Sequence, residues 1–165
     1  MRMSHLVIIM NNILHDIEKV FKWVNDELPL DQRRPGGYFC LSVNQRWGGP
    51  PLLVLRVGEP PEGKRVNFFE FCQEKAARLG AHPEHLTASQ SRDETAKQYG
   101  GAVRLDDFIL SFSGLPEEYD EELLLMLLEP NRWLGFLPDP IDPEQIAAIR
   151  QASQEVYHPA PASSE

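Results

Sequence analysis

The sequence has few cysteines, an excess of acidic over basic residues, and no long apolar run. Its two cysteines, Cys40 and Cys72, lie far apart and form no CxxC pair. Buried free thiols in a reducing compartment are therefore expected rather than a disulfide framework. The apolar run over residues 6–10 is too short for a signal-peptide core or a membrane span. We therefore predict a cytoplasmic protein without a membrane partner.

Basic residues are also few relative to acidic ones. Lysine and arginine number 16 against 25 aspartates and glutamates, which gives a formal net charge of −9 and a pI near 5.0. Such a surface argues against nucleic acid or an anionic membrane as the main partner. With 165 residues, of which 42% are hydrophobic, the chain suits one globular domain. We predict that this domain covers residues 1–157 and that residues 158–165 form a disordered tail.

Common catalytic motifs are also missing. The sequence contains no GxxxxGK[ST] phosphate loop, no GxGxxG turn and no nucleophile elbow with a matching Ser-His-Asp set. No residue is therefore assigned a catalytic role, and the sequence favours a protein that is not an enzyme.

The pattern of apolar residues predicts four helices and four strands. Apolar residues recur at spacings of three and four in the helical stretches, and the strands are short apolar runs bounded by glycine, proline or acidic turns. The short connections inside each strand pair predict two antiparallel hairpins. Segment 87–98 is polar and fits either a short exposed helix or a loop. The predicted helices cover residues 4–28, 66–79, a stretch beginning at Pro116, and 144–157; the predicted strands cover 38–44, 52–57, 102–105 and 108–112.

This order of elements predicts an α+β domain, with an antiparallel sheet and flanking helices. We expect the helices to cover one face of the sheet and the other face to lie in solvent or against a second subunit. Residues 123–128 are apolar almost all round, so this part of its helix is buried or lies at an interface. An interface of this kind would make the chain a homo-oligomer.

Several short motifs occur in a recognisable order between residues 38 and 128. The second predicted strand ends near Arg56, the next helix contains Lys75-Ala76, and Gly100-Gly101 precedes the second hairpin. That hairpin ends in Ser113-Gly114, and an acidic helix containing Asp120 follows. In this order and spacing the chain resembles the GlcG/HbpS-like family, which is often described as haem-binding or haem-degrading.

The resemblance implies a profilin-like fold, an oligomer, and a small-molecule ligand such as haem in some members. The chain departs from the family pattern in the first hairpin, in a shortened segment before Gly100, and in an added proline-rich loop and helix after residue 128. Two other hypotheses stay open. One is a structural or assembly protein that keeps the fold without a pocket, and the other is an enzyme acting on haem or a small hydroxy acid.

Two glycine-containing motifs are candidate ligand-binding residues. The backbone N–H groups of Gly100 and Gly101 could approach an anion, whereas the alternative is a plain glycine turn before a strand. Ser113 and Gly114 could form an anion site at the start of the following helix. The alternative is that Ser113 or a neighbour caps this helix.

The remaining candidates are side chains of histidine, lysine and acidic residues. His82 and His85 are three residues apart, so they could ligate a haem or a metal, or be two solvent-exposed loop histidines. Lys75 is interpreted as a surface lysine rather than a catalytic amine. The acidic residues after Pro116 are explained by the helix dipole, so no metal site is predicted there.

Overall fold

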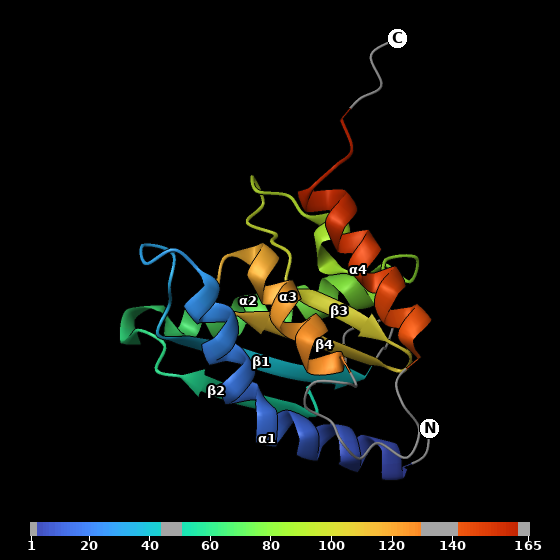
Figure 1. Ribbon diagram of the computed structural model, residues 1–165, viewed down its shortest axis with the longest axis horizontal. Coiled ribbons are helices and arrows are strands. Elements are labelled where there is room, and N and C mark those ends of the chain that lie inside the picture. The colour runs from blue at the N-terminus through green and yellow to red at the C-terminus, as the bar shows by residue number, and fades with distance from the viewer. Residues whose placement is uncertain (1–2, 44–50, 130–141, 162–165) are drawn as a thin grey trace.

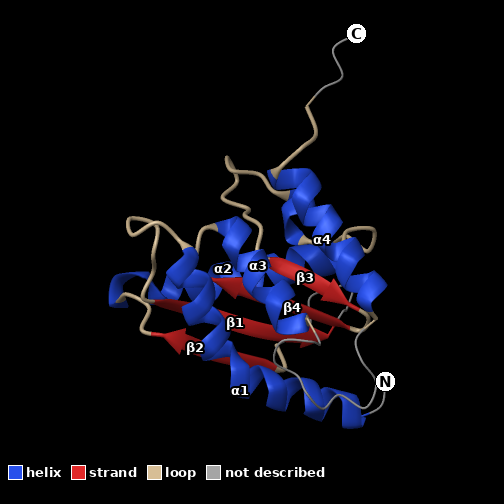
Figure 2. Ribbon diagram, in the orientation of Figure 1, coloured by secondary structure: helices blue, strands red, loops and turns tan. Residues whose placement is uncertain are grey.

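The fold consists of one four-stranded antiparallel sheet with helices packed against it. The computed structural model describes residues 3–43, 51–129 and 142–161. The sheet has the order β2-β1-β4-β3, and the predicted α+β class is confirmed (Figures 1 and 2). In chain order the elements are α1 (Met3–Glu27), β1 (Gly36–Val43), β2 (Leu53–Gly58), η1 (Glu62–Lys64), α2 (Arg65–Ala81), η2 (Ala88–Ser91), β3 (Ala102–Leu105), β4 (Phe108–Ser113), α3 (Glu117–Leu128) and α4 (Pro143–Tyr157).

Both predicted hairpins form, and they meet in the middle of the sheet. β1 pairs with β2, β3 pairs with β4, and β1 and β4 join the two hairpins through a pairing in which Cys40 faces Ser111. The second hairpin turns at Asp106, whose φ of 47° is left-handed, a conformation that aspartate adopts more readily than most residues. The predicted turn over 45–51 and the loop over 133–143 lie almost wholly outside the described residues.

Helices cover both faces of the sheet, so the prediction of one covered face is wrong. Phe39, Leu110 and Phe112 share one face and belong to the same buried cluster as side chains of α1 and α3. The opposite face carries smaller side chains, including Ala102 and Ile109, which pack with Ala76 and Leu79 of α2. Figure 1 shows α1 and α3 in front of the sheet and α2 largely behind it.

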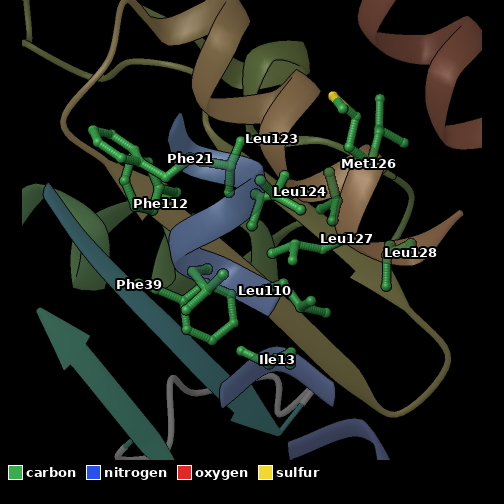
Figure 3. Close-up of a cluster of buried hydrophobic side chains, with 14 of the residues drawn as sticks. Ile13, Phe21, Phe39, Leu110, Phe112, Leu123, Leu124, Met126, Leu127 and Leu128 are labelled. Carbon is green, nitrogen blue, oxygen red and sulfur yellow. The ribbon is translucent and has the colours of Figure 1, made fainter. Parts of the chain in front are cut away.

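The larger core lies between the sheet, α1 and α3. The stripe on α1 that includes Ile17, Val20 and Val24 is buried, and Figure 3 shows α1 side chains close to the leucines of α3. All side chains of residues 123–128 are buried within the chain. The expectation that this stretch is buried is therefore met without a second subunit, because α3 lies between the sheet, α1 and α4.

The segment between α2 and β3 has little regular structure but is not simply exposed. Thr87, Ala88 and Ser89 are buried, and η2 is the one short helix there. Of the two alternatives for residues 87–98, a short exposed helix or a loop, a short helix forms over Ala88–Ser91, but its first two residues are buried rather than exposed. No helix within the described residues combines the length and the apolar composition needed to cross a membrane.

Candidate functional site

A pocket of about 310 Å³ opens at the corner where β4 ends and α3 begins. Ser113 and Gly114 lie on its lining, as the sequence placed them, and three half-buried aromatic rings complete the wall. Phe71 and Tyr99 contact each other edge to face, with ring centroids 5.7 Å apart. The described residues that line the pocket are Phe68, Phe71, Lys75, Tyr99, Ser113, Gly114, Leu115, Glu117 and Asp120.

The charged part of the pocket lining is a buried ion pair between α2 and α3. Lys75 Nζ lies 2.8 Å from Asp120 Oδ2, and the two residues are only 2% and 1% exposed. Lys75 also donates to the Phe112 carbonyl at 3.0 Å, and the Leu115 N–H donates to Asp120 Oδ1 at 2.8 Å. The interpretation of Lys75 as a surface lysine is therefore wrong: it faces the end of β4 and its charge is balanced inside the fold.

Burial is the main influence on the pKa of Asp120. It raises the pKa of Asp120 from 3.8 to about 7, although the nearby Lys75 ammonium acts in the opposite direction. A carboxyl with such a pKa exchanges its proton near neutral pH, which most surface carboxylates do not. The pocket therefore contains a group whose charge responds to small changes in its surroundings.

The glycine pair lies beside the ion pair, and its N–H groups bind the chain's own carboxylates. The Gly100 N–H donates to Glu117 Oε2 at 2.6 Å, and the Gly101 N–H donates to Glu121 Oε1 at 3.1 Å. An external anion was one of the two alternatives for these N–H groups, the other being a plain glycine turn before a strand. In the structure that position is taken by side chains of α3, so the pair organises the site from within.

Glu121 is the most enclosed of the acidic residues. It is 0% exposed, and Ser89 and Ser153 both donate to Oε2 through their hydroxyls, at 3.1 and 2.6 Å. The Ser89 N–H donates to Oε1 at 3.1 Å. Burial raises the pKa of Glu121, and these hydrogen bonds oppose the rise. The carboxyl therefore joins η2, the start of β3, α3 and α4.

Glu117 completes the acidic cluster at the edge of the pocket. Burial alone would raise its pKa, but the hydrogen bonds from Arg92, Gly100 and Tyr157 hold it below the usual value. The interpretation that the helix dipole alone explains these acidic residues is thus incomplete, since Glu117, Asp120 and Glu121 each have specific partners. Capping of α3 by a side chain of Ser113 or a neighbour is wrong as well, because the N-cap is Pro116 and no side chain bonds there.

His82 and His85 lie away from this pocket, where α2 ends. Neither lines it, so the structure does not bring the histidines together with Ser113 and Gly114. Their rings stack on each other with centroids 4.8 Å apart. The alternative of two solvent-exposed histidines is only half right, because the His85 side chain is 20% exposed and the His82 side chain 42%.

The sequence analysis missed the aromatic wall, although a signal for it existed. Phe68, Phe71 and Lys75 occur at spacings of three and four, so they share one side of a helix. Of the motifs that carry the family resemblance, Lys75, the glycine pair, Ser113-Gly114 and Asp120 all meet at this corner. Arg56 does not, since it lies on the edge strand β2 near Glu59.

Comparisons of the chain with protein-family models, curated proteins and solved structures found no match. The resemblance to the GlcG/HbpS-like family therefore stays a prediction, and the site is interpreted from its own residues.

Replacing Gly101 by alanine should lower the free energy of unfolding by about 2–4 kcal/mol, because it combines backbone strain with a steric clash. The φ of Gly101 is +114°, and a Cβ atom there would lie 2.7 Å from Lys75 Nζ and 2.8 Å from the Phe112 carbonyl oxygen. Gly63→Ala is the matched control, since a Cβ at Gly63 meets nothing within 4 Å. Urea unfolding midpoints measure both; equal midpoints for the two variants would contradict the prediction.

Asp120→Asn should change the free energy of unfolding near neutral pH by no more than about 1 kcal/mol, because the raised pKa of Asp120 means that the fold already accepts this side chain uncharged beside the Lys75 ammonium. Lys75→Met should lower the free energy of unfolding, because it removes the donor to the Phe112 carbonyl and to Asp120. The double variant should be about as stable as Lys75→Met alone, because the Lys75 ammonium is absent from both. Urea unfolding of the unmodified chain, the two single variants and the double variant gives the double-mutant cycle for this pair. The exposed Lys22–Asp26 pair supplies the control, and Asp26→Asn should leave the midpoint unchanged.

The pH dependence of stability in the same proteins separates the effect of the Asp120 charge from the effect of its shape. Between the ordinary pKa of 3.8 and the folded value of about 7, the folded chain binds more protons at Asp120 than the unfolded chain does. Asp120 therefore makes stability fall as pH rises through this window, and Asp120→Asn should remove that contribution. An Asp120→Asn variant with the pH profile of the unmodified chain would contradict this prediction.

Proposed function

We propose that the chain binds a small ligand in the pocket at the Ser113–Gly114 corner, as a binding protein rather than an enzyme. The observation that carries this proposal is an aromatic wall beside a buried ion pair in one pocket. Ligand sites typically combine mostly apolar walls with a few fixed polar groups, often with a perturbed pKa. Neither histidine nor cysteine is among the described lining residues, which argues against a histidine-activated nucleophile.

The lining also indicates the chemistry of the ligand. Phe68, Phe71 and Tyr99 favour a flat ring that can stack or meet them edge to face. An ammonium group has three N–H donors, and two partners of Lys75 are found within the described part of the chain. The third donor suits a carbonyl or hydroxyl oxygen of the ligand. Since Lys75 and Asp120 balance each other, we propose a neutral aromatic or cyclic compound that carries such an oxygen.

Haem is the ligand that the family resemblance suggests, but the size of the pocket and its lining residues limit how haem could bind. Its volume of about 310 Å³ lies at the lower end of the range for ligand pockets, so it favours a smaller molecule than a tetrapyrrole. Among its lining residues Tyr99 is the one whose side chain is known to ligate haem iron. Binding of haem here would require Tyr99 as a ligand and a wider opening of the pocket.

The test is a titration of ¹⁵N-labelled chain with small neutral aromatic carbonyl compounds, followed by NMR. The expected result is saturable shifts of the amide signals of Tyr99, Gly114 and Leu115. Phe71→Ala should weaken binding by about tenfold or more, because it removes part of the stacking wall. Phe69→Ala is the control on the same helix, since Phe69 contacts Tyr38 instead of lining the pocket.

Two results of this titration would overturn the proposal. One is that no compound of this class shifts the pocket signals, and the other is that Phe71→Ala and Phe69→Ala bind equally. Haem is titrated in parallel, and a Soret shift that is lost in Tyr99→Phe would identify haem as the ligand.

Assembly into a homo-oligomer is a second candidate function, favoured by an exposed apolar surface. Val66 and Phe69, near the start of α2, are 66% and 37% exposed. Phe69 packs on Tyr38, which pairs with Arg56 of β2 at the open edge of the sheet. An apolar surface beside an unpaired strand edge is a common place for self-association.

Light scattering over a range of chain concentrations tests this second candidate. The unmodified chain should form a dimer or a larger species, and Val66→Asp should shift it toward the monomer. Leu30→Asp is the control, because Leu30 is 81% exposed and lies in the segment between α1 and β1. A monomer at every concentration, or equal effects of the two variants, would contradict assembly through this surface.

A further inference from the structure

The loop that follows α2 carries three side chains with metal-binding atoms close together. His82, Glu84 and His85 each offer a ligand atom, and these atoms lie within 4.8 Å of one another. Glu84 Oε1 is 3.4 Å from His82 Nδ1 and 3.5 Å from His85 Nε2. We propose that these three residues bind a divalent first-row transition metal ion, with Zn²⁺ as the ion that their ligand atoms suit best.

The separations of Glu84 from the two histidines, which are those of ion pairs, are also compatible with shared ligation of one ion. N–H···O hydrogen bonds in proteins are about 2.7–3.2 Å long, so both His–Glu84 distances exceed that range. Two ligand atoms that are each about 2.1 Å from a tetrahedral zinc ion are about 3.4 Å apart. The distances from Glu84 Oε1 to the two imidazole nitrogens therefore match the distance between two ligands of the same zinc ion.

The His85 ring is not fixed through its second nitrogen. Its Nδ1 atom is buried and has no hydrogen-bond partner within the described residues. The nitrogen assigned to the metal is the other one, Nε2, which faces Glu84 Oε1. No hydrogen bond at Nδ1 therefore prevents the ring from adjusting to a metal at Nε2.

The backbone of this loop is fixed by a buried guanidinium group. Arg104 of β3 donates to the carbonyls of His82 and His85, both at 2.9 Å, and also to that of Leu79. The His85 N–H donates to the His82 carbonyl at 3.0 Å, which closes a tight turn. Both histidines thus start from a backbone that is held in place, and this lowers the entropy cost of binding an ion.

The ligand atoms indicate which ion is preferred, and the surrounding charge indicates how tightly it binds. Two imidazoles and one carboxylate suit zinc better than magnesium or calcium, which prefer oxygen ligands. Three protein ligands leave a fourth position for water or another molecule. The positive charge of Arg104 opposes a cation here, so we expect affinity in the micromolar rather than the nanomolar range. The half-exposed His82 ring has to tilt from its stacked position to complete the site.

Isothermal titration of the full chain without an affinity tag tests the proposal, with ZnCl₂ as the titrant. The expected result is one bound ion per chain, with His82→Ala and His85→Ala each weakening binding at least about tenfold. Glu84→Gln should weaken binding less, because an amide oxygen remains. His158→Ala is the control: His158 Nε2 lies 2.5 Å from Glu118 Oε1, which makes it an exposed histidine–carboxylate pair without a second histidine.

Two further measurements distinguish loss of metal binding from loss of folding. Circular dichroism without metal establishes that each variant is folded, and Zn²⁺ should raise the melting temperature of the unmodified chain but not of the His82→Ala chain. Co²⁺ in place of Zn²⁺ should give the visible absorption of a four-coordinate site. The proposal is overturned if the unmodified chain binds no Zn²⁺ at submillimolar concentration, or if the histidine variants bind it as tightly as His158→Ala does.

Discussion

The constraint on which the structure depends is the burial of the acidic start of α3. Asp120 and Glu121 are 1% and 0% exposed, and a carboxylate removed from water is costly unless other groups donate to it. The donors come from every neighbouring layer: Lys75 of α2, Ser89 of η2, Gly101 at the start of β3, and Ser153 of α4. One polar corner therefore links α2, η2, the start of β3, α3 and α4, in addition to the two apolar cores.

This corner also explains why glycines stand where they do. A Cβ at Gly100 would lie 1.9 Å from the Tyr157 hydroxyl, and one at Gly114 would lie 2.6 Å from the Gly37 Cα. At Gly100 the close approach lets the N–H reach Glu117, whereas at Gly114 it lets the end of β4 pass close to the start of β1. The pocket at the same corner lies where the chain turns from β4 into α3, and its polar groups are held by this network. Ligand binding there would use groups whose positions the fold already needs.

Local sequence patterns predicted most of the helices and strands. Which faces of the sheet are covered, and which residues form the site, depend on contacts between residues far apart in the sequence. The stripe on α1 and the turn at Asp106 are readable because each depends on residues a few positions apart. The two covered faces had a signal in β4, which begins with three consecutive large apolar residues, Phe108, Ile109 and Leu110, instead of alternating apolar with polar. Lys75 gave a weaker signal. It lies three residues after Cys72 and four before Leu79, on the apolar side of its helix, but its partner Asp120 lies 45 positions away.

The segment between α2 and β3 was the hardest to interpret from the sequence, and both proposed sites draw on it. It contributes His85 to one site and Tyr99 to the other, yet it contains little regular structure. Two buried arginines replace the missing backbone ladder. Arg78 donates to the Ala88 and Tyr99 carbonyls, and Arg104 donates to those of His82 and His85. Backbone carbonyls inside a fold need donors, and a guanidinium group can serve several at once. Because these donors come from α2 and β3, the backbone of the segment is held between two regular elements, and this fixed backbone carries His85 and Tyr99.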